Sequence, residues 1–198
     1  MTHIVGILLA AGRATRFGSD KLLAPLANAP ADLAAGTPVG IAAARHLVAA
    51  VPDSIAVVRA QEDVLAKRLR ASGLRIVVCA DADDGMGASL ACGVAAARDA
   101  DGWVIALADM PWIAPVTIRA VVDALAAGAD IAVPAFDGER GHPVGFARRH
   151  YDALAVLRGD AGARALLRSH PHRVALLDVD DPGILRDVDT PADLDPAA

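Results

Sequence analysis

Positive charge, cysteine and long apolar runs are all scarce in this chain of 198 residues. The 19 Lys and Arg residues are outnumbered by 24 Asp and Glu, and the net charge of -5 gives a nucleic-acid partner no electrostatic support. The two cysteines, Cys79 and Cys92, lack the spacing of metal ligands. We expect them to be buried free thiols in the reducing cytoplasm, with a disulfide as the lesser alternative.

No apolar run reaches the roughly 18 residues that would predict a membrane span. Residues 1–16 contain a short apolar run without a preceding basic segment, which indicates a first strand and not a signal peptide. Hydrophobic residues nevertheless make up 55% of the sequence, enough for a packed core. The composition therefore predicts a globular cytoplasmic protein, and the length fits a single domain over residues 1–198.

Short apolar runs alternate with helical patterns along most of the chain. Strands are expected at 3–9, 54–58, 75–79, 102–107, 130–134, 142–147 and 173–179. Helices are expected at 38–50, 62–72, 89–98, 116–128, 151–157 and 161–169. This alternation predicts an α/β fold, with a Rossmann-like, mostly parallel sheet between two layers of helices. Spacing does not predict the order of the last strands, and the Ala/Pro-rich segment 24–38 is expected to be a surface excursion.

The first expected strand runs into a glycine-containing segment with three cations, Leu8–Lys21. Ligands of doubly wound sheets bind beyond the carboxyl ends of the strands, and Gly12 and Gly18 would let the backbone approach an anion there. Arg16 can make forked contacts with phosphate oxygens, and Lys21 can act as a point charge. The spacing matches neither the dinucleotide fingerprint nor the P-loop, so the residues alone leave an ordinary surface loop open.

A second glycine-rich turn, residues 81–90, follows the third expected strand and leads into a helix. Gly85 and Gly87 would permit a close approach to a ligand. Ser89 is a candidate helix cap or ligand hydroxyl. A plain loop with a helix cap is the structural alternative.

Carboxylates occur at two further places where a ligand could bind. Asp109 directly follows the fourth expected strand, where it could hold a divalent cation against phosphates. Asp187 and Asp189 have the two-residue spacing that puts side chains on the same side of a strand. Convergence of these three carboxylates would suit Mg²⁺, which takes few protein ligands plus substrate phosphates. Solvated acidic turns are the alternative.

The segment after Asp189 has the signature of a helix start. Thr190 is expected to be the cap, Pro191 the first helical residue, and Asp193 the second member of a capping-box-like pair.

Two other stretches, "GERGHPVGF" and "GDAGARALL", could each close one wall of a pocket. The first contains His142 and the second contains Asp160. A lone histidine is more often structural than catalytic, and the other five histidines show no ligand spacing.

Taken together, these stretches resemble the molybdenum cofactor nucleotidyltransferases, within the wider group of sugar- and cofactor-phosphate nucleotidyltransferases. The family pattern L-A-A-G-x-S-x-R-M-G-x-x-K is matched from Leu9 to Lys21, except that Ala14 replaces Ser and Phe17 replaces Met. The patterns G-M-x-x-S-[LI], G-D-M-P, G-H-P and D-[IV]-D-T-P-x-D-[LFY] have counterparts at 85–90, 108–111, 141–143 and 187–194. Position 108 is Ala in place of Gly, and the family's upstream Asn-Pro is replaced by Cys79 and Ala80.

The resemblance implies a nucleotide-diphospho-sugar transferase fold of the GT-A-like type. It also implies transfer of a nucleoside monophosphate to a phosphorylated acceptor, with release of pyrophosphate. Residues 10–12, 141–143 and the "GDAGAR" stretch are similar to the cytidylyltransferase branch. That similarity implies CTP as donor, a molybdopterin-type phosphate as acceptor, and a molybdoenzyme as a further partner.

Together with the residue patterns, the resemblance implies a set of site residues. Arg16, Lys21 and Asp109 are expected to be catalytic. Asp109, Asp187 and Asp189 are expected to hold Mg²⁺. His142 and Asp160 are expected on the acceptor side. The expected nucleotide-binding residues are Leu9, Ala10, Ala11, Gly12, Arg16, Lys21, Asp81, Gly87 and Ser89.

The expected reaction is in-line attack of the acceptor's phosphate oxygen on the α-phosphorus, which depends on positioning and charge stabilisation. Three alternatives stay open. One is a transferase of the same fold that uses GTP or a sugar phosphate. Another is a non-catalytic, nucleotide-dependent factor that delivers a cofactor to an enzyme. The third, a nicotinamide oxidoreductase, lacks the glycine fingerprint.

Overall fold

Eight strands form one mixed sheet in the computed structural model, which describes residues 2–12, 17, 20–60, 63–159 and 162–194. The strands are β1 (Ile4–Leu9), β2 (Ser54–Val58), β3 (Arg75–Val78), β4 (Gly102–Leu107), β5 (Ile131–Phe136), β6 (Glu139–Arg140), β7 (Val144–Ala147) and β8 (Val174–Asp178). Their order is β3-β2-β1-β4-β7-β5-β6, and β8 also pairs with β5. The first four strands run parallel, whereas β7 is antiparallel to both β4 and β5. The expected mostly parallel sheet is confirmed.

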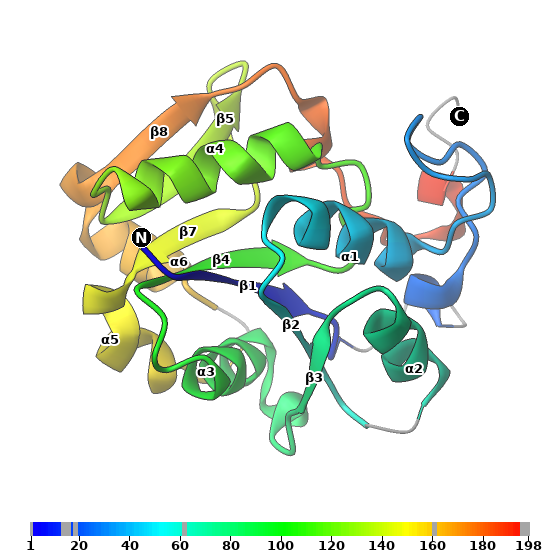
Figure 1. Cartoon of the computed structure of the whole chain (residues 1–198), viewed down its shortest axis with the longest axis horizontal. Helices are drawn as coiled ribbons and strands as arrows, with labels where there is room; N and C mark the ends of the chain where they lie inside the picture. Colours follow the sequence, from blue (N-terminus) through cyan, green and yellow to red (C-terminus); the bar gives the residue numbers. More distant parts are fainter. Residues whose placement is uncertain (1, 13–16, 18–19, 61–62, 160–161, 195–198) are drawn as a thin grey trace.

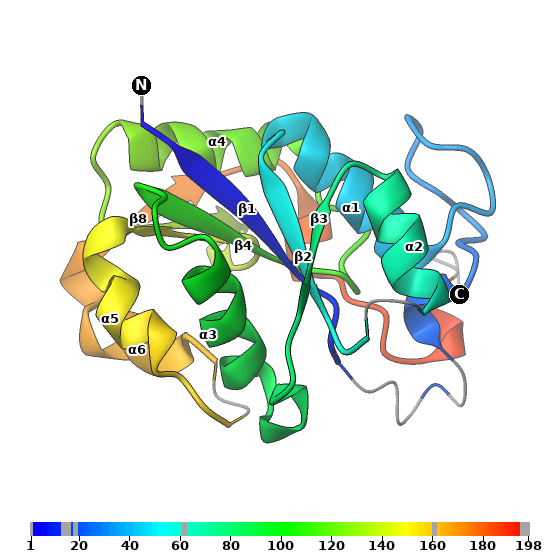
Figure 2. The same ribbon diagram turned by 60° about the horizontal axis from the view of Figure 1, so that its bottom comes forward.

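Helices cover both faces of this sheet (Figures 1 and 2). The α-helices in the described ranges are α1 (Val39–Ala50), α2 (Val64–Ala71), α3 (Met86–Ala96), α4 (Pro115–Ala126), α5 (Tyr151–Ala155) and α6 (Arg164–Ser169). Helices α1 and α4 pack together on one face, and α3 and α5 pack together on the other. The three-layer arrangement expected from the sequence is therefore present. None of the helices in the described ranges combines the length and apolar character needed to cross a membrane.

The central strands are buried on both faces, which explains their continuous apolar runs. Ile4 and Leu8 of β1 pack into the core under α1 and α4, while Val5 and Ile7 pack into the core under α3. Helix α3 approaches the sheet closely because Gly93 has no side chain. A Cβ at Gly93 would lie 2.7 Å from the Ile7 Cγ2 atom.

Several elements differ from the sequence-based expectation. Helix α3 begins at Met86, three residues before the expected start, because Gly85 adopts φ 99° and serves as its N-cap. Ser89 is therefore inside the first turn of the helix and is not its cap. The short strand β6 was not expected, since two exposed residues carry no period-2 signal. Segment 24–38 lies outside the helices and strands, as expected, but its Leu26 is buried in the core.

Both cysteines are free thiols, as expected. Cys79 is buried as expected, whereas Cys92 on α3 is partly exposed, so the expectation of a buried thiol is wrong for Cys92.

Candidate active site

The candidate site lies where the parallel strands β1 and β4 end side by side. Leu9 pairs with Leu107 at this edge of the sheet. Asp109 follows β4 by two residues, and the loop that carries Lys21 follows β1. The chain moves outward from β1 to β2 and β3 and then returns to β4 on the other side of β1. This is the switch in strand order beyond which ligands of open α/β sheets bind.

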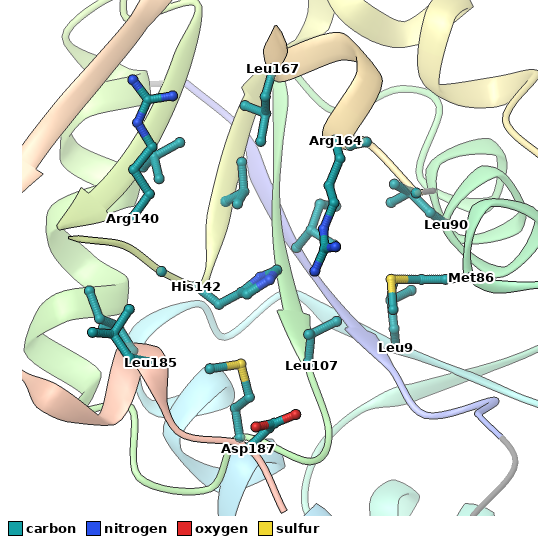
Figure 3. A pocket seen from close by; sticks show the side chains of 18 of the residues that line it. Leu9, Met86, Leu90, Leu107, Arg140, His142, Arg164, Leu167, Leu185 and Asp187 are labelled. Atoms are coloured by element: carbon teal, nitrogen blue, oxygen red, sulfur yellow. The ribbon is translucent and has the colours of Figure 1, made fainter. Parts of the chain in front are cut away.

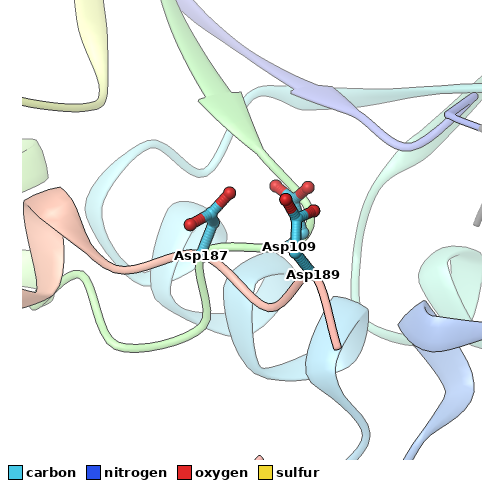
Figure 4. A group of neighbouring side chains, drawn as sticks. All are labelled: Asp109, Asp187 and Asp189. Carbon is cyan, nitrogen blue, oxygen red and sulfur yellow. The ribbon is translucent and has the colours of Figure 1, made fainter. Parts of the chain in front are cut away.

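Three carboxylates converge at this edge (Figure 4). Asp109, Asp187 and Asp189 each offer one oxygen, and these oxygens lie within 4.8 Å of one another. The backbone N–H of Val188 donates to the carbonyl oxygen of Asp109 at 2.9 Å, and the Val188 side chain is fully buried. The carboxylates on either side of Val188 consequently meet Asp109. They lie on an irregular segment and not on a strand, which corrects the expected element but leaves them side by side.

A turn after Asp189 holds this segment in place. The Asp193 carboxylate accepts from the backbone N–H groups of Asp189 at 3.0 Å and Thr190 at 2.6 Å, and from the Thr190 hydroxyl at 2.9 Å. These bonds, above all that from the Thr190 backbone, lower the pKa of Asp193. The expected capping pair is half right, because the Thr190 hydroxyl donates to Asp193 instead of accepting from the backbone. The helix that follows is the short 3₁₀ turn Pro191–Leu194.

Lys21 contacts two of the three carboxylates. Its Nζ atom donates to Asp109 Oδ2 at 2.8 Å and to Asp189 Oδ1 at 3.2 Å, and its side chain is 14% exposed. Burial by itself lowers the pKa of Lys21, but the hydrogen bonds and charges of Asp109 and Asp189 outweigh it and raise that pKa. Lys21 begins a 3₁₀ turn whose Leu22 is buried and whose cap is the Asp20 side chain. The lysine therefore starts from an anchored backbone.

The acidic cluster is electrostatically suited to a hard cation. Burial raises the pKa of Asp187, and the neighbouring charges of Asp189 and Asp109 raise it further. All three donors are carboxylate oxygens, which are the ligands that Mg²⁺ and Mn²⁺ prefer. The three residues could hold such an ion.

A cavity of about 430 Å³ and a second of about 530 Å³ adjoin at this site. Leu9, Met86 and Leu107 line both of them. Asp109 lines the larger cavity, and Asp187 lines the smaller one. The acidic cluster therefore lies at the junction of the two cavities.

The larger cavity contains four of the expected nucleotide-binding residues, Leu9, Ala11, Gly12 and Ser89. Sequence reasoning missed Arg59 and Asp83, which line the same cavity. The Arg59 guanidinium pairs with the Asp83 carboxylate and donates to the Ala82 carbonyl. The position of Arg59 directly after β2, at the same edge of the sheet, is the signal that could have identified it.

Among the described residues, four of the expected nucleotide-binding residues line neither of these cavities, and one of them is Lys21, which contacts the carboxylates. The backbone N–H of Ala10 is used within the sheet, where it donates to the Val57 carbonyl at 2.9 Å. The Gly87 N–H donates to the Gly159 carbonyl at 2.7 Å, so this glycine serves a close contact within the chain. Asp81 is exposed and begins the 3₁₀ turn Ala82–Asp84.

Two further expected site residues, Arg16 and Asp160, lie outside the described residues. Their roles stay sequence-based predictions.

The smaller cavity has apolar walls and carries cations (Figure 3). Arg140 and Arg164 both line it, and the Arg164 and His142 side chains point into it. The backbone N–H of His142 donates to the Ile184 carbonyl at 3.1 Å, whereas its buried Nδ1 atom has no hydrogen-bond partner among the described residues. Burial lowers the pKa of His142; Asp109 opposes this shift and Arg164 adds to it.

Solved structures with this architecture define the class of protein. Rv0371c from Mycobacterium tuberculosis H37Rv superposes with a TM-score of 0.77 at 36% identity, covering 97% of this chain and 95% of that one. A complex of Rv0371c with manganese gives 0.70 at 33% identity, covering 97% and 96%. A nucleotidyl transferase from Methanothermobacter thermautotroptrophicus gives 0.77 at 26% identity, covering 96% and 94%. The fold is that of the nucleotide-diphospho-sugar transferases.

Relatives found by sequence show to which family within this class the chain belongs. The "purine catabolism protein PucB" of Bacillus subtilis is 33% identical over 204 residues, which cover 98% of this chain and 95% of that protein. The "nicotine blue oxidoreductase" of Paenarthrobacter nicotinovorans is 33% identical over 195 residues, which cover 94% and 92%. The family model "MobA-like NTP transferase domain" matches residues 6–174. The chain therefore belongs to the MobA-like nucleotidyltransferase family.

Proposed function

We propose that this protein is a cytidylyltransferase that transfers CMP from CTP to a phosphorylated, molybdopterin-type acceptor and releases pyrophosphate. One observation carries the proposal. Asp109 lines the larger cavity, Asp187 lines the smaller one, and their ligand oxygens lie within 4.8 Å of each other. A donor in one cavity and an acceptor in the other would therefore react at the acidic cluster, beside Lys21.

In this reaction an acceptor phosphate oxygen forms a bond to the α-phosphorus. The bond between the α-phosphorus and the oxygen that bridges it to the β-phosphate breaks, and pyrophosphate leaves with that oxygen. No side chain has to act as a nucleophile, so the task of the protein is to align the two substrates and offset charge. Lys21 supplies a cation at the reacting phosphates, and Arg16 is proposed from the sequence to supply a second. The backbone at Ala11 and Gly12 would meet the nucleotide.

Asp109, Asp187 and Asp189 would hold Mg²⁺, which when bound neutralises phosphate charge and acts as a Lewis acid. The clustered oxygen donors support this assignment, and the manganese complex of Rv0371c is consistent with it. The loop that carries Asp187 and Asp189 reaches the site through the hydrogen bond from Val188 to Asp109. A correctly placed cluster therefore depends on residues nearly 80 positions apart.

The smaller cavity supports an acceptor with an apolar body and an anionic group. Apolar side chains such as Leu90, Phe146 and Leu167 can pack against a ring system. Arg140 and Arg164 provide cations that can pair with a phosphate. His142, and Asp160 from the sequence, are proposed to contact the acceptor.

The name of one relative keeps a second function under consideration. The nicotine blue oxidoreductase has 33% identity to this chain, and its name denotes a different reaction. We rank that alternative lower because the sequence lacks the dinucleotide fingerprint. A cytoplasmic location, a single domain over residues 1–198 and a molybdoenzyme partner remain parts of the proposal.

The decisive experiment measures pyrophosphate release with Mg²⁺, molybdopterin cofactor and a panel of CTP, GTP and other triphosphates. We expect turnover with CTP, and a fall in kcat of about 100-fold or more in Asp109→Asn, since one charged contact of the reacting centre is lost. Asp99→Asn is the matched control, because its side chain is 92% exposed at the surface. Unchanged turnover in Asp109→Asn would remove this residue from the site. A preference for GTP would indicate a guanylyltransferase of the same fold. Nucleotide binding without pyrophosphate release would indicate a non-catalytic factor that delivers a cofactor to an enzyme.

A further inference from the structure

Lys21 occupies carboxylates that a metal ion would also need. Its ammonium group contacts Asp109 and Asp189, which are two of the three carboxylates that could hold a metal ion. The Lys21 side chain is 14% exposed and that of Asp109 is 25% exposed, so water screens this pair only in part. An ion pair of this kind is stronger than one on an open surface.

A divalent cation at the cluster would have to replace these contacts. Magnesium and manganese bind carboxylate oxygens at about 2.1 Å, which places the ion within the space between the ligand oxygens. The Lys21 nitrogen already lies 2.8 Å and 3.2 Å from two of those oxygens. Two cations so close would repel each other strongly. The ammonium group and the metal ion therefore compete for Asp109 and Asp189.

We propose that Lys21 is an internal counter-ion of the acidic cluster. The Lys21 ammonium group leaves Asp109 and Asp189 to the metal ion when a bound triphosphate offers this ammonium group a new anionic partner. This inference rests on the proposed function, because it takes the cluster as the metal site and a polyphosphate as the ligand. Lys21 is anchored at the start of a 3₁₀ turn, so the exchange needs only its flexible side chain to move. Binding of the metal ion then strengthens binding of the nucleotide, and the reverse also holds. The Lys21 side chain links the two binding steps.

The exchange predicts opposite effects of one substitution. Without the Lys21 ammonium, Asp109 and Asp189 lose a cation that competes with the metal ion, so a metal ion alone binds more tightly. The same change removes a cation that the triphosphate needs, so a polyphosphate alone binds more weakly. A lysine that merely held the fold together would weaken both interactions when replaced.

Two binary titrations with Lys21→Met test this. Isothermal titration calorimetry with Mn²⁺ alone should show an affinity about tenfold higher than in the unsubstituted protein. Titration with inorganic tripolyphosphate in the presence of EDTA should show an affinity about tenfold lower. Lys67→Met is the matched control, since Lys67 is the other lysine of the chain and is exposed on α2; it should change neither value. Lys21→Gln, which can still donate to a carboxylate, replaces the Met variant if that variant does not fold.

The outcomes separate this inference from the proposed function. If Mn²⁺ binds Lys21→Met no more tightly than the unsubstituted protein, the counter-ion role is overturned. This conclusion holds even if the unsubstituted protein releases pyrophosphate from CTP. If the opposite shifts occur but no triphosphate yields pyrophosphate, the exchange stands and the proposed reaction fails. If Mn²⁺ binds neither the unsubstituted protein nor the variants, the counter-ion role is overturned, whereas the proposed reaction still stands or falls with pyrophosphate release.

Discussion

His142 shows what a single residue contributes at the site. Its ring points into the smaller cavity, and its Nδ1 atom is buried without a hydrogen-bond partner in the described part of the chain. Burial favours the neutral ring, and the guanidinium of Arg164 adds to that preference. A neutral imidazole can still accept a hydrogen bond from an acceptor molecule in this cavity.

The lowered pKa of His142 predicts a pH dependence of stability. An unfolded chain takes up a proton at this histidine near its ordinary pKa of about 6.5, whereas the folded protein takes it up only at lower pH. The free energy of unfolding should therefore fall as the pH drops below about 6.5. Urea unfolding at pH 7.5 and 5.5 should show a smaller loss in His142→Gln than in the unsubstituted protein.

His172→Gln is the control for this measurement, because His172 is exposed. An equal loss of stability in His142→Gln and the unsubstituted protein would contradict the prediction.

Residue-level reasoning from the sequence succeeded for two side chains in the loops that follow parallel strands. Lys21 and Asp109 follow β1 and β4, and the structure brings them within 2.8 Å. Gly87 and Asp81 were expected to bind the nucleotide for the same reason, yet neither lines the cavity. A glycine can serve a ligand or a neighbouring loop, and only the contact with Gly159 distinguishes the two.

At the scale of elements, helix α4 is capped by a residue far away in the sequence. Its own N-cap, Ala114, has no side-chain oxygen. The buried Asp181 carboxylate accepts from the Ala114 N–H at 2.9 Å and from the Thr117 hydroxyl at 2.6 Å. Its other oxygen accepts from the Gly183 N–H at 3.0 Å, which begins the turn Pro182–Leu185. One carboxylate thus joins α4 to the segment that leads to Asp187.

Replacement of Asp181 should be costly. We expect Asp181→Ala to lower the free energy of unfolding by about 2 kcal/mol or more, because buried donors lose their acceptor. Chemical denaturation measures this effect. The exposed neighbour provides the control, and Asp180→Ala should stay within about 0.5 kcal/mol of the unsubstituted protein. A similar small change in Asp181→Ala would show that the cap is dispensable.

At the scale of the whole molecule, the site joins three distant parts of the chain. Lys21, Asp109 and Asp189 come from the loop after β1, the loop after β4 and the C-terminal segment. Ligands that contact all three should stabilise the folded state as a whole, because they bind the unfolded chain poorly.

This linkage predicts a rise in melting temperature with ligands. At concentrations about 100 times their Kd, ligands add about 2.7 kcal/mol, or about 5–10 °C for a chain of this size. Differential scanning calorimetry with Mn²⁺ and an α,β-methylene analogue of CTP should show this rise. The same ligands should stabilise Asp109→Asn much less. An equal rise in the variant would place the binding elsewhere.

The β-α rhythm and the family were readable from the sequence because hydrophobic period and short motifs are local, whereas helix ends such as the start of α3 were not. Carboxylates and cations in the segments after the strands also indicated a site at one edge of the sheet, since parallel strands end together. The insertion of β7 between β4 and β5, the pairing of Arg59 with Asp83 and the capping of α4 by Asp181 are contacts between distant segments. No local pattern encodes such contacts, and only packing of the whole chain decided them.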